Sequence, residues 1–302
     1  MAGRSLTLVL AVVAGACSGP SRRGGDAGGG GGTGDAERLY QEGLSWTRKA
    51  ETAPLPAPPP AASGVGQNPA SLAAPAFQTE ELRALESFEK ALAAQPDHAG
   101  ANLALADLLA PHAIRHYAAE LQARESAARS RPRRGDPASD APVATPAPVI
   151  AVDASPARVI RAYEAAVQAD PGRTPVDRLI AFAVRVGRLD AAESGHQELL
   201  RRVKESAEPY ALYGDFLSAQ KKDLDGAVDQ YRQALIWKPD DQATRQKLGE
   251  IYLVRGIDYY SRQEFARAAV EFRECQKYVT GRESEQGRRL QTYLARMKEI
   301  RR

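Results

Sequence analysis

The stretch "YEAAVQADP" at residues 163–171 carries the pattern that decides the fold of this chain. Its aromatic residue is followed three places later by a small residue and eight places later by a proline. The same spacing occurs in "FEKALAAQP" (88–96) and "YRQALIWKP" (231–239), and "AAVEFRECQKYVT" (268–280) repeats it with Thr280 in place of the proline. An alanine or valine also stands four places before each aromatic, which puts these side chains on one helix face. The proline ends the helix. The chain therefore contains a recurring amphipathic helix.

A second helix pattern accompanies the first. "YALYGDFL" (210–217) and "RQKLGEIY" (245–252) each place a glycine after a large apolar residue. The paired patterns resemble the two helices of a tetratricopeptide repeat, which recurs every 34 residues. Pro171 and Pro239 are 68 residues apart, which is twice that period, so a degenerate repeat is expected over 178–203, with Gly187 at its turn. The interval from Pro239 to Thr280 is seven residues longer than the 34-residue period, which predicts longer arms in the last hairpin.

We predict an all-α, tetratricopeptide-like α-solenoid of about five helical hairpins, closed by a C-terminal capping helix over about 283–302. Two hairpins are split by inserts rich in proline and alanine, at about 51–78 and 130–154, which we expect to be disordered. The first insert separates a helix over 36–50 from one capped by Thr79. The second separates the helix over 99–129, which continues past Pro111, from one that starts at Pro156. An unrelated alanine-rich bundle is the alternative fold.

The N-terminus has the features of a secretion signal. Arg4 precedes an apolar run from Leu6 to Ala16, which is too short to span a bilayer. Small residues stand directly before Cys17, and this arrangement resembles a bacterial lipoprotein signal, although Ala14 replaces the usual leucine. The resemblance implies a signal peptide at 1–16, then lipidated Cys17 with a glycine-rich tether over 17–35, and a folded domain over 36–302. Ser18, which follows the cysteine, implies that the lipoprotein is sorted to the outer membrane, where it would face the periplasm. A conventional cleavage site that happens to lie near a cysteine is the alternative.

Composition and motifs give little sign of chemistry. The net charge of +3 is too small to imply nucleic acid as a partner. The sequence has no GxSxG, HExxH or paired CxxC motif, so we expect no enzymatic activity, no cofactor, no metal and no small-molecule substrate. The other cysteine, Cys275, occupies a small-residue packing position. One stripe of His112, His116 and Glu120 could hold zinc, which leaves an envelope enzyme or metal-binding protein as the alternative. His98 and His196 are isolated in the sequence.

The resemblance implies that protein or peptide partners bind through the first helices of the repeats, along a concave surface. We predict a membrane-anchored scaffold of the bacterial cell envelope, such as a pilotin-like or outer-membrane assembly factor, held at the membrane by the Cys17 lipid. The lysine, asparagine and arginine set of the known carboxylate clamp is not found. Polar residues on the rows of the first helices that are not used for packing are the candidate partner-binding residues: Asp107, Arg178, Arg185, Asp215, Ser218, Gln246 and Glu250.

Overall fold

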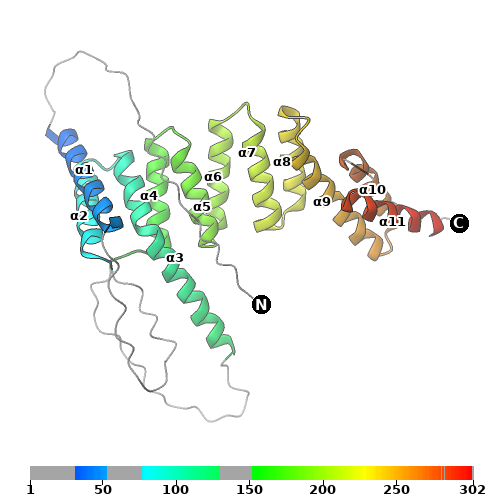
Figure 1. Ribbon diagram of the computed structural model, residues 1–302, viewed down its shortest axis with the longest axis horizontal. Coiled ribbons are helices and arrows are strands. Elements are labelled where there is room, and N and C mark those ends of the chain that lie inside the picture. Colours follow the sequence, from blue (N-terminus) through cyan, green and yellow to red (C-terminus); the bar gives the residue numbers. More distant parts are fainter. Residues whose placement is uncertain (1–30, 53–76, 130–151, 280, 282, 301–302) are drawn as a thin grey trace, which may run out of the picture.

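The structure is a computed structural model, and it describes residues 31–52, 77–129, 152–279, 281 and 283–300. The predicted signal peptide, Cys17, most of the tether and most of both inserts lie outside the described residues. Within the described ranges the regular elements are helices, and Figure 1 shows them as a row of hairpins. This arrangement is the predicted tetratricopeptide-like α-solenoid.

Five antiparallel hairpins follow one another along the described chain (Figure 1). A capping helix, α11 (Glu285–Ile300), comes last, as predicted. The insert positions also agree with the prediction, since the gaps fall between α1 and α2 and between α3 and α4. The hairpins are α1 (Gly31–Thr52) with α2 (Thr79–Ala94), α3 (Ala99–Arg129) with α4 (Pro156–Ala169), α5 (Thr174–Arg185) with α6 (Leu189–Arg202), α7 (Ala207–Phe216) with α8 (Leu224–Trp237), and α9 (Gln242–Ser261) with α10 (Phe265–Tyr278).

Short polar residues begin several of the helices. Ser155, Ser206, Asp223 and Asp241 each accept a hydrogen bond from a backbone N–H of the first turn, which satisfies one of the groups that a helix start leaves open. The start of α2 differs from the prediction by one residue. Its N-cap is Gln78 rather than Thr79, because the backbone N–H of Gln78 donates to the side chain of Glu81 at 2.8 Å.

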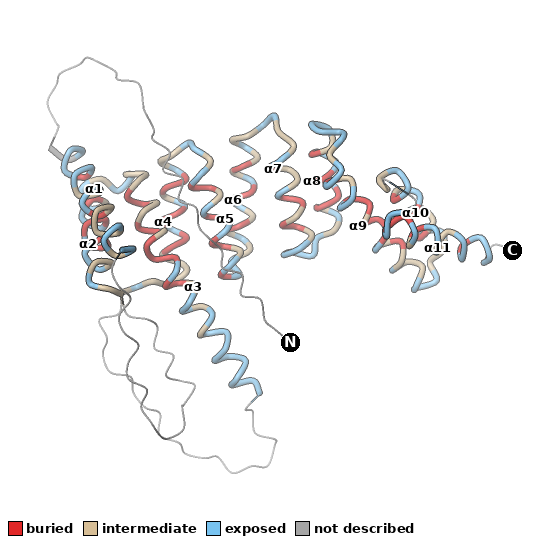
Figure 2. Tube along the Cα trace, viewed as in Figure 1, coloured by how far each residue is buried: buried red, intermediate tan, exposed pale blue. Residues whose placement is uncertain are grey.

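The aromatic residue of the recurring helix packs directly on a glycine of the partner helix. A Cβ at Gly43 would lie 2.4 Å from the Phe88 ring, and one at Gly214 would lie 2.7 Å from the ring of Tyr231. Such close approach brings the two helices of a hairpin together over their whole contact. The buried residues form two clusters, one over α2 to α6 and one from α5 to α11 (Figure 2).

The last hairpin corrects the prediction that both of its arms are longer. Its second helix α10 has 14 residues, like α4, α6 and α8. Only the first arm is lengthened, since α9 has 20 residues whereas α5 has 12 and α7 has 10. The glycine beneath Phe272 is Gly256, where a Cβ would lie 2.5 Å from the ring, and not Gly249 of the "RQKLGEIY" motif. Gly249 instead faces Gln286 of α11. The two extra turns of α9 therefore allow one helix to pack against α10 and α11 at different heights.

One extra residue in the fourth hairpin is accommodated locally. The separation from Gly214 to Tyr231 is one residue longer than that from Gly256 to Phe272. The π-helical segment η2 (Leu217–Lys221) at the end of α7 takes up this residue, as π turns commonly do. It ends at Lys222, which has a left-handed backbone conformation with φ of 59°. The packing of Tyr231 on Gly214 is thereby preserved.

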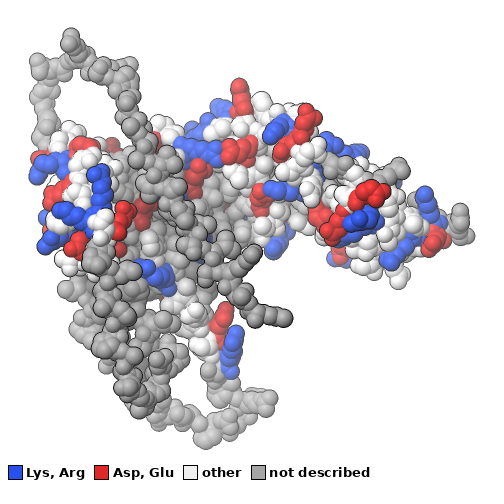
Figure 3. Space-filling model, viewed as in Figure 1, with Lys and Arg blue, Asp and Glu red and all other residues white. Residues whose placement is uncertain are grey.

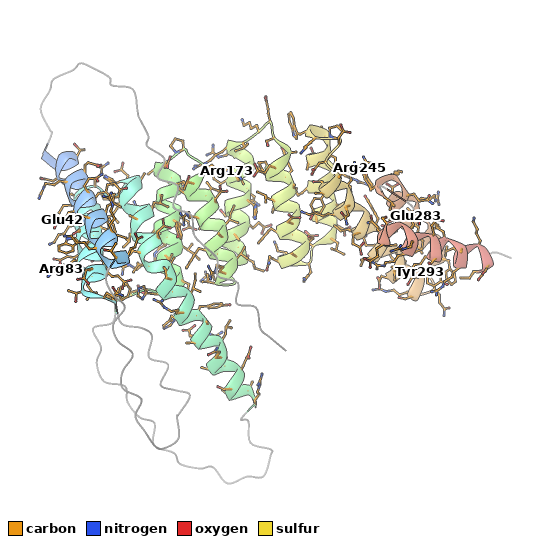
Figure 4. The ribbon with its side chains drawn as sticks, viewed as in Figure 1. Glu42, Arg83, Arg173, Arg245, Glu283 and Tyr293 are labelled. Atoms are coloured by element: carbon orange, nitrogen blue, oxygen red, sulfur yellow. The ribbon has the colours of Figure 1, made fainter. Side chains whose placement is uncertain are left out.

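The α3 helix runs through Pro111, as predicted, and its C-terminal part extends beyond the stack (Figure 1). Residues 120–129 are exposed on all sides. At the start of the solenoid, Glu42 and Arg83 lie on the outer face of the first hairpin (Figure 4). The Lys49 ammonium and the Arg83 guanidinium lie over the ring of Trp46, at 3.8 Å and 4.6 Å from its centroid. These charged groups give the terminal repeat the polar outer face that a solenoid end requires.

Candidate partner-binding face

The first helices of the hairpins share a short pattern around one buried residue. Leu179 in α5, Tyr213 in α7 and Leu248 in α9 are all buried at this place. The residue before each of them and the residue two places after it point to the same open side. We call this side the first-helix face, and it comprises Asp107, Arg178, Ala181, Arg185, Leu212, Asp215, Lys247, Glu250 and Arg289.

Ion pairs connect neighbouring helices across this face. The Lys247 ammonium lies 2.7 Å from both carboxylate oxygens of Asp215, which links α9 to α7. The Arg289 guanidinium donates to Glu250 at 2.8 Å, which links α11 to α9. A longer contact of 3.9 Å joins Arg178 of α5 to Asp107 of α3. Each pair joins the acid of one first helix to the cation of the next.

Two of these acids also accept a hydrogen bond from a tyrosine of the second helix. Tyr163 donates to Asp107 and Tyr231 donates to Asp215, each at 2.7 Å. Burial and the adjacent carboxylate raise the pKa of each tyrosine, so both hydroxyls stay protonated and act as donors. Burial also raises the pKa of Asp107. The tyrosine of the repeat motif therefore has a polar role in addition to its packing role.

The row of ion pairs is interrupted between α5 and α7. At this junction Ala181 stands where the other helices have an acid, and Leu212 stands where the next helix would supply a cation. The Leu212 side chain is 37% exposed. One turn beyond Ala181, Arg185 is exposed and forms no ion pair with any described residue. Among the described residues, the ion-pair row is thus missing at Ala181 and Leu212, beside Arg185, and we call this interruption the α5–α7 opening.

Some of the seven predicted binding residues form an ion pair with a neighbouring helix, and the others do not. Asp107 and Arg178 come together, and Asp215 and Glu250 pair with cations that sequence reasoning missed, namely Lys247 and Arg289. The Ser218 hydroxyl donates to the backbone carbonyl of Asp215 at 3.1 Å, and the carbonyl of Gln246 accepts from Gln286 at 3.2 Å. Of the seven side chains, those of Arg185 and Gln246 form no hydrogen bond or ion pair with a described residue, and Arg185 is the charged one. Sequence reasoning also missed Leu212, although its place before Tyr213 gives the necessary signal.

The predicted histidine stripe does not act as one unit. The His112 ring stacks on Phe77 with centroids 3.7 Å apart, and its Nε2 lies 3.3 Å from Glu81. His116 instead pairs with Glu120 on the exposed side of α3, at 3.6 Å. In the part of the chain that the structure describes, no group of three or more histidine, cysteine, aspartate or glutamate residues is arranged to hold a metal. His112 and His116 therefore have separate partners on α3 and its neighbours.

The remaining candidate groups for chemistry are buried. Cys275 is fully buried, as predicted, and burial raises the pKa of its thiol to about 12, so it is protonated and unreactive at neutral pH.

On the side formed by the second helices, a shallow groove of about 390 Å³ lies between α4 and α6, and Arg161 and Arg188 are among its lining residues. Figure 3 shows acidic and basic side chains interspersed over the face in view. None of the described helices has the length and apolar character of a membrane span.

The sequence matches no protein-family model and no curated protein. Several solved structures are similar to it at low identity. A MamA crystal structure is 13% identical, with 81% of this chain and 91% of that chain covered and a TM-score of 0.38. The crystal structure of YrrB, described as a TPR protein with an unusual peptide-binding site, is 14% identical, with 66% and 78% covered and a TM-score of 0.35. The structure of Pseudomonas aeruginosa pilF is 12% identical, with 89% and 93% covered and a TM-score of 0.35.

The assignment of the fold follows from the packing within this chain. The recurring aromatic residue lies on a glycine of the partner helix in three hairpins, and a buried residue recurs in the first helices at Leu179, Tyr213 and Leu248. The described chain is a tetratricopeptide-like α-solenoid of five helical hairpins and a C-terminal capping helix.

Proposed function

We propose that this protein is a non-catalytic scaffold of a bacterial cell envelope, and that it binds an extended segment of a partner protein at the α5–α7 opening. The observation that carries the proposal is the interruption of the ion-pair row at Ala181 and Leu212, next to Arg185, which has no ion-pair partner among the described residues. Solenoids of stacked hairpins offer extended surfaces on which a partner can lie.

The chemistry of the opening indicates the kind of segment that fits. An apolar partner side chain over Leu212 and Ala181 would be removed from water, which contributes about 25 cal/mol per Å² of apolar surface. A carboxylate placed one turn away would pair with Arg185. Elsewhere on the first-helix face the charged groups already satisfy one another, so they contribute less to binding. We therefore propose a partner segment with an apolar anchor residue and a nearby acidic residue.

Capture of the partner from envelope extracts tests this proposal. The full chain should enrich one or more proteins after mild crosslinking, and Arg185→Glu should reduce their recovery at least tenfold, since it replaces an attraction by a repulsion. Arg161→Glu on the second-helix side is the matched control, because it makes the same charge change on an exposed arginine away from the opening. Equal recovery with Arg185→Glu and the unchanged chain would contradict the proposed site.

The membrane anchor is a separate part of the proposal, and the lipoprotein-like sequence before Cys17 supports it. Two or more acyl chains give stable anchoring, because each buried CH₂ contributes about 0.8 kcal/mol. In cells fed labelled palmitate, the unchanged chain should carry the label in the membrane fraction. Cys17→Ala should lose the label. Labelling that persists in Cys17→Ala would exclude Cys17 as the lipidated residue. Within such an envelope, a pilotin-like or outer-membrane assembly role is the specific form that we propose.

A further inference from the structure

Two large apolar residues stand next to each other at the C-terminal end of α8. Ile236 is 66% exposed and Trp237 is 47% exposed. They occupy the fifth and sixth places after the packed aromatic residue of the repeat. The other hairpins have small or polar residues or a partly buried tyrosine at these places: Ala93 and Ala94, Gln168 and Ala169, Arg201 and Arg202, and Lys277 and Tyr278. We call the Ile236–Trp237 pair the α8 tip.

The helix geometry explains why the α8 tip faces outward. Tyr231 and Ala234 are buried and fix the side of α8 that packs on α7. The end of α8 lies at the edge of the stack where the second helices turn into the next first helices, and Figure 1 shows the α6–α7 and α8–α9 turns along this edge. Burial of Trp237 would require α8 to rotate, which would expose Tyr231. The apolar tip is therefore a fixed projection of the fold.

An exposed lysine follows the tip directly in the sequence. Lys238 pairs with Asp241 at 3.7 Å, directly after the tip. On the neighbouring second helix α10, Lys277 pairs with Glu274 at 2.6 Å. These pairs are exposed, so each contributes little to stability and its cation can exchange partners at low cost. The tip is therefore an apolar pair followed directly by an exposed lysine, whose charge Asp241 balances.

We propose that the α8 tip inserts into the headgroup region of a phospholipid membrane. Tryptophan prefers this region because its ring is apolar while its indole N–H remains hydrogen-bonded. The exposed Lys238 side chain next to the tip can extend to a lipid phosphate. A stable protein interface needs about 800 Å² on each partner, which a projection of two side chains does not offer. The tip gives the scaffold a second membrane contact in addition to a lipid at Cys17, and this inference rests only on the envelope location in the proposed function.

The chain contains two tryptophans, so single-tryptophan variants can test the tip directly. Trp46→Phe leaves Trp237 as the reporter, and Trp237→Phe leaves Trp46 as the matched control. Each full chain is mixed with vesicles of phosphatidylethanolamine and phosphatidylglycerol at three to one. In Trp46→Phe we expect the emission to shift to shorter wavelength and to be quenched by brominated acyl chains. In Trp237→Phe we expect neither change.

Ile236→Asp in the Trp46→Phe background should remove the emission shift and weaken vesicle affinity roughly tenfold or more, since it removes apolar surface and adds a charge. The same substitution should leave partner capture at the α5–α7 opening unchanged, which separates this inference from the proposed partner site. If the Trp46→Phe substitution lowers the helix content, the difference between the spectra of the unchanged chain and Trp237→Phe gives the same readout. If vesicles do not change the emission of Trp237, the proposal is overturned, even when the chain sediments with the vesicles.

Discussion

Replacement of Tyr231 with alanine should lower the free energy of unfolding by about 3–5 kcal/mol. The Tyr231 ring is 2% exposed, and it lies on Gly214 in the centre of the fourth hairpin. Alanine would leave a cavity between α7 and α8 and would also remove the hydroxyl that donates to Asp215. Urea denaturation followed by circular dichroism measures the change.

Tyr231→Phe is the matched control for this substitution. It keeps the ring and removes only one hydrogen bond, which costs about 1 kcal/mol. Asp215 keeps its ion pair with Lys247, so its carboxylate is not left without a partner. A loss with Tyr231→Ala that is no larger than the loss with Tyr231→Phe would contradict the packing of the fourth hairpin. Solenoids can unfold in parts. A second probe placed near α7 and α8 should therefore give the same order of stability, with the unchanged chain highest, Tyr231→Phe next and Tyr231→Ala lowest.

Acidification below pH 6.5 should destabilise the protein through His196. This histidine is 6% exposed, stacks on Tyr213 and lies beside Phe216, and its Nδ1 has no hydrogen-bond partner among the described residues. Burial lowers its pKa from 6.5 to about 4, with a smaller opposing effect of Glu193. The unfolded chain therefore binds a proton at a pH where the folded chain does not. Neutral His196 therefore makes its full contribution to the free energy of unfolding above pH 6.5. This contribution is lost as the pH falls toward 4, by roughly 2 kcal/mol between pH 6.5 and 5.

His196→Phe isolates this effect. It places at this position the kind of residue that the other hairpins have there, and it removes both the titrating group and the buried unpaired nitrogen. We expect the variant to be more stable than the unchanged chain at pH 5 by roughly 2 kcal/mol, with a smaller difference at pH 7.5. Denaturant titrations at the two pH values give the comparison. A difference between the two proteins that does not change with pH would show that His196 is protonated equally in the folded and unfolded chains.

The sequence predicts the solenoid because its signals are local. The spacing of aromatic, small and proline residues sets the ends and the packed face of each second helix, and the structure confirms that pattern for Phe88, Tyr163, Tyr231 and Phe272. His196 shows where the pattern was incomplete. It lies four places after Ala192 and so occupies the aromatic place of the degenerate third hairpin, but it is a histidine where the other copies have phenylalanine or tyrosine, and no proline follows it at the expected place.

The first-helix face could be predicted only in part. Periodicity identifies which row of a first helix does not pack, and the structure places Arg178, Asp215 and Glu250 on that row. It does not show which open residues satisfy one another, because the partners lie on the next repeat, as Lys247 and Arg289 do. The sequence leaves the packing of α9 open for a similar reason. A helix lengthened by two turns offers both Gly249 and Gly256 as packing sites, and tertiary contact with Phe272 decides between them.

Site-specific photocrosslinking tests the central claim most directly. A photoreactive amino acid replaces Leu212 in the α5–α7 opening, and in a control it replaces Val270, which is also exposed but lies on α10. After irradiation in the intact envelope, the chain with the photoreactive residue at 212 should form a discrete crosslinked product with a partner protein, and Arg185→Glu in the same chain should reduce that product. Crosslinking that is equal at 212 and 270, or that is unchanged by Arg185→Glu, would contradict partner binding at this opening.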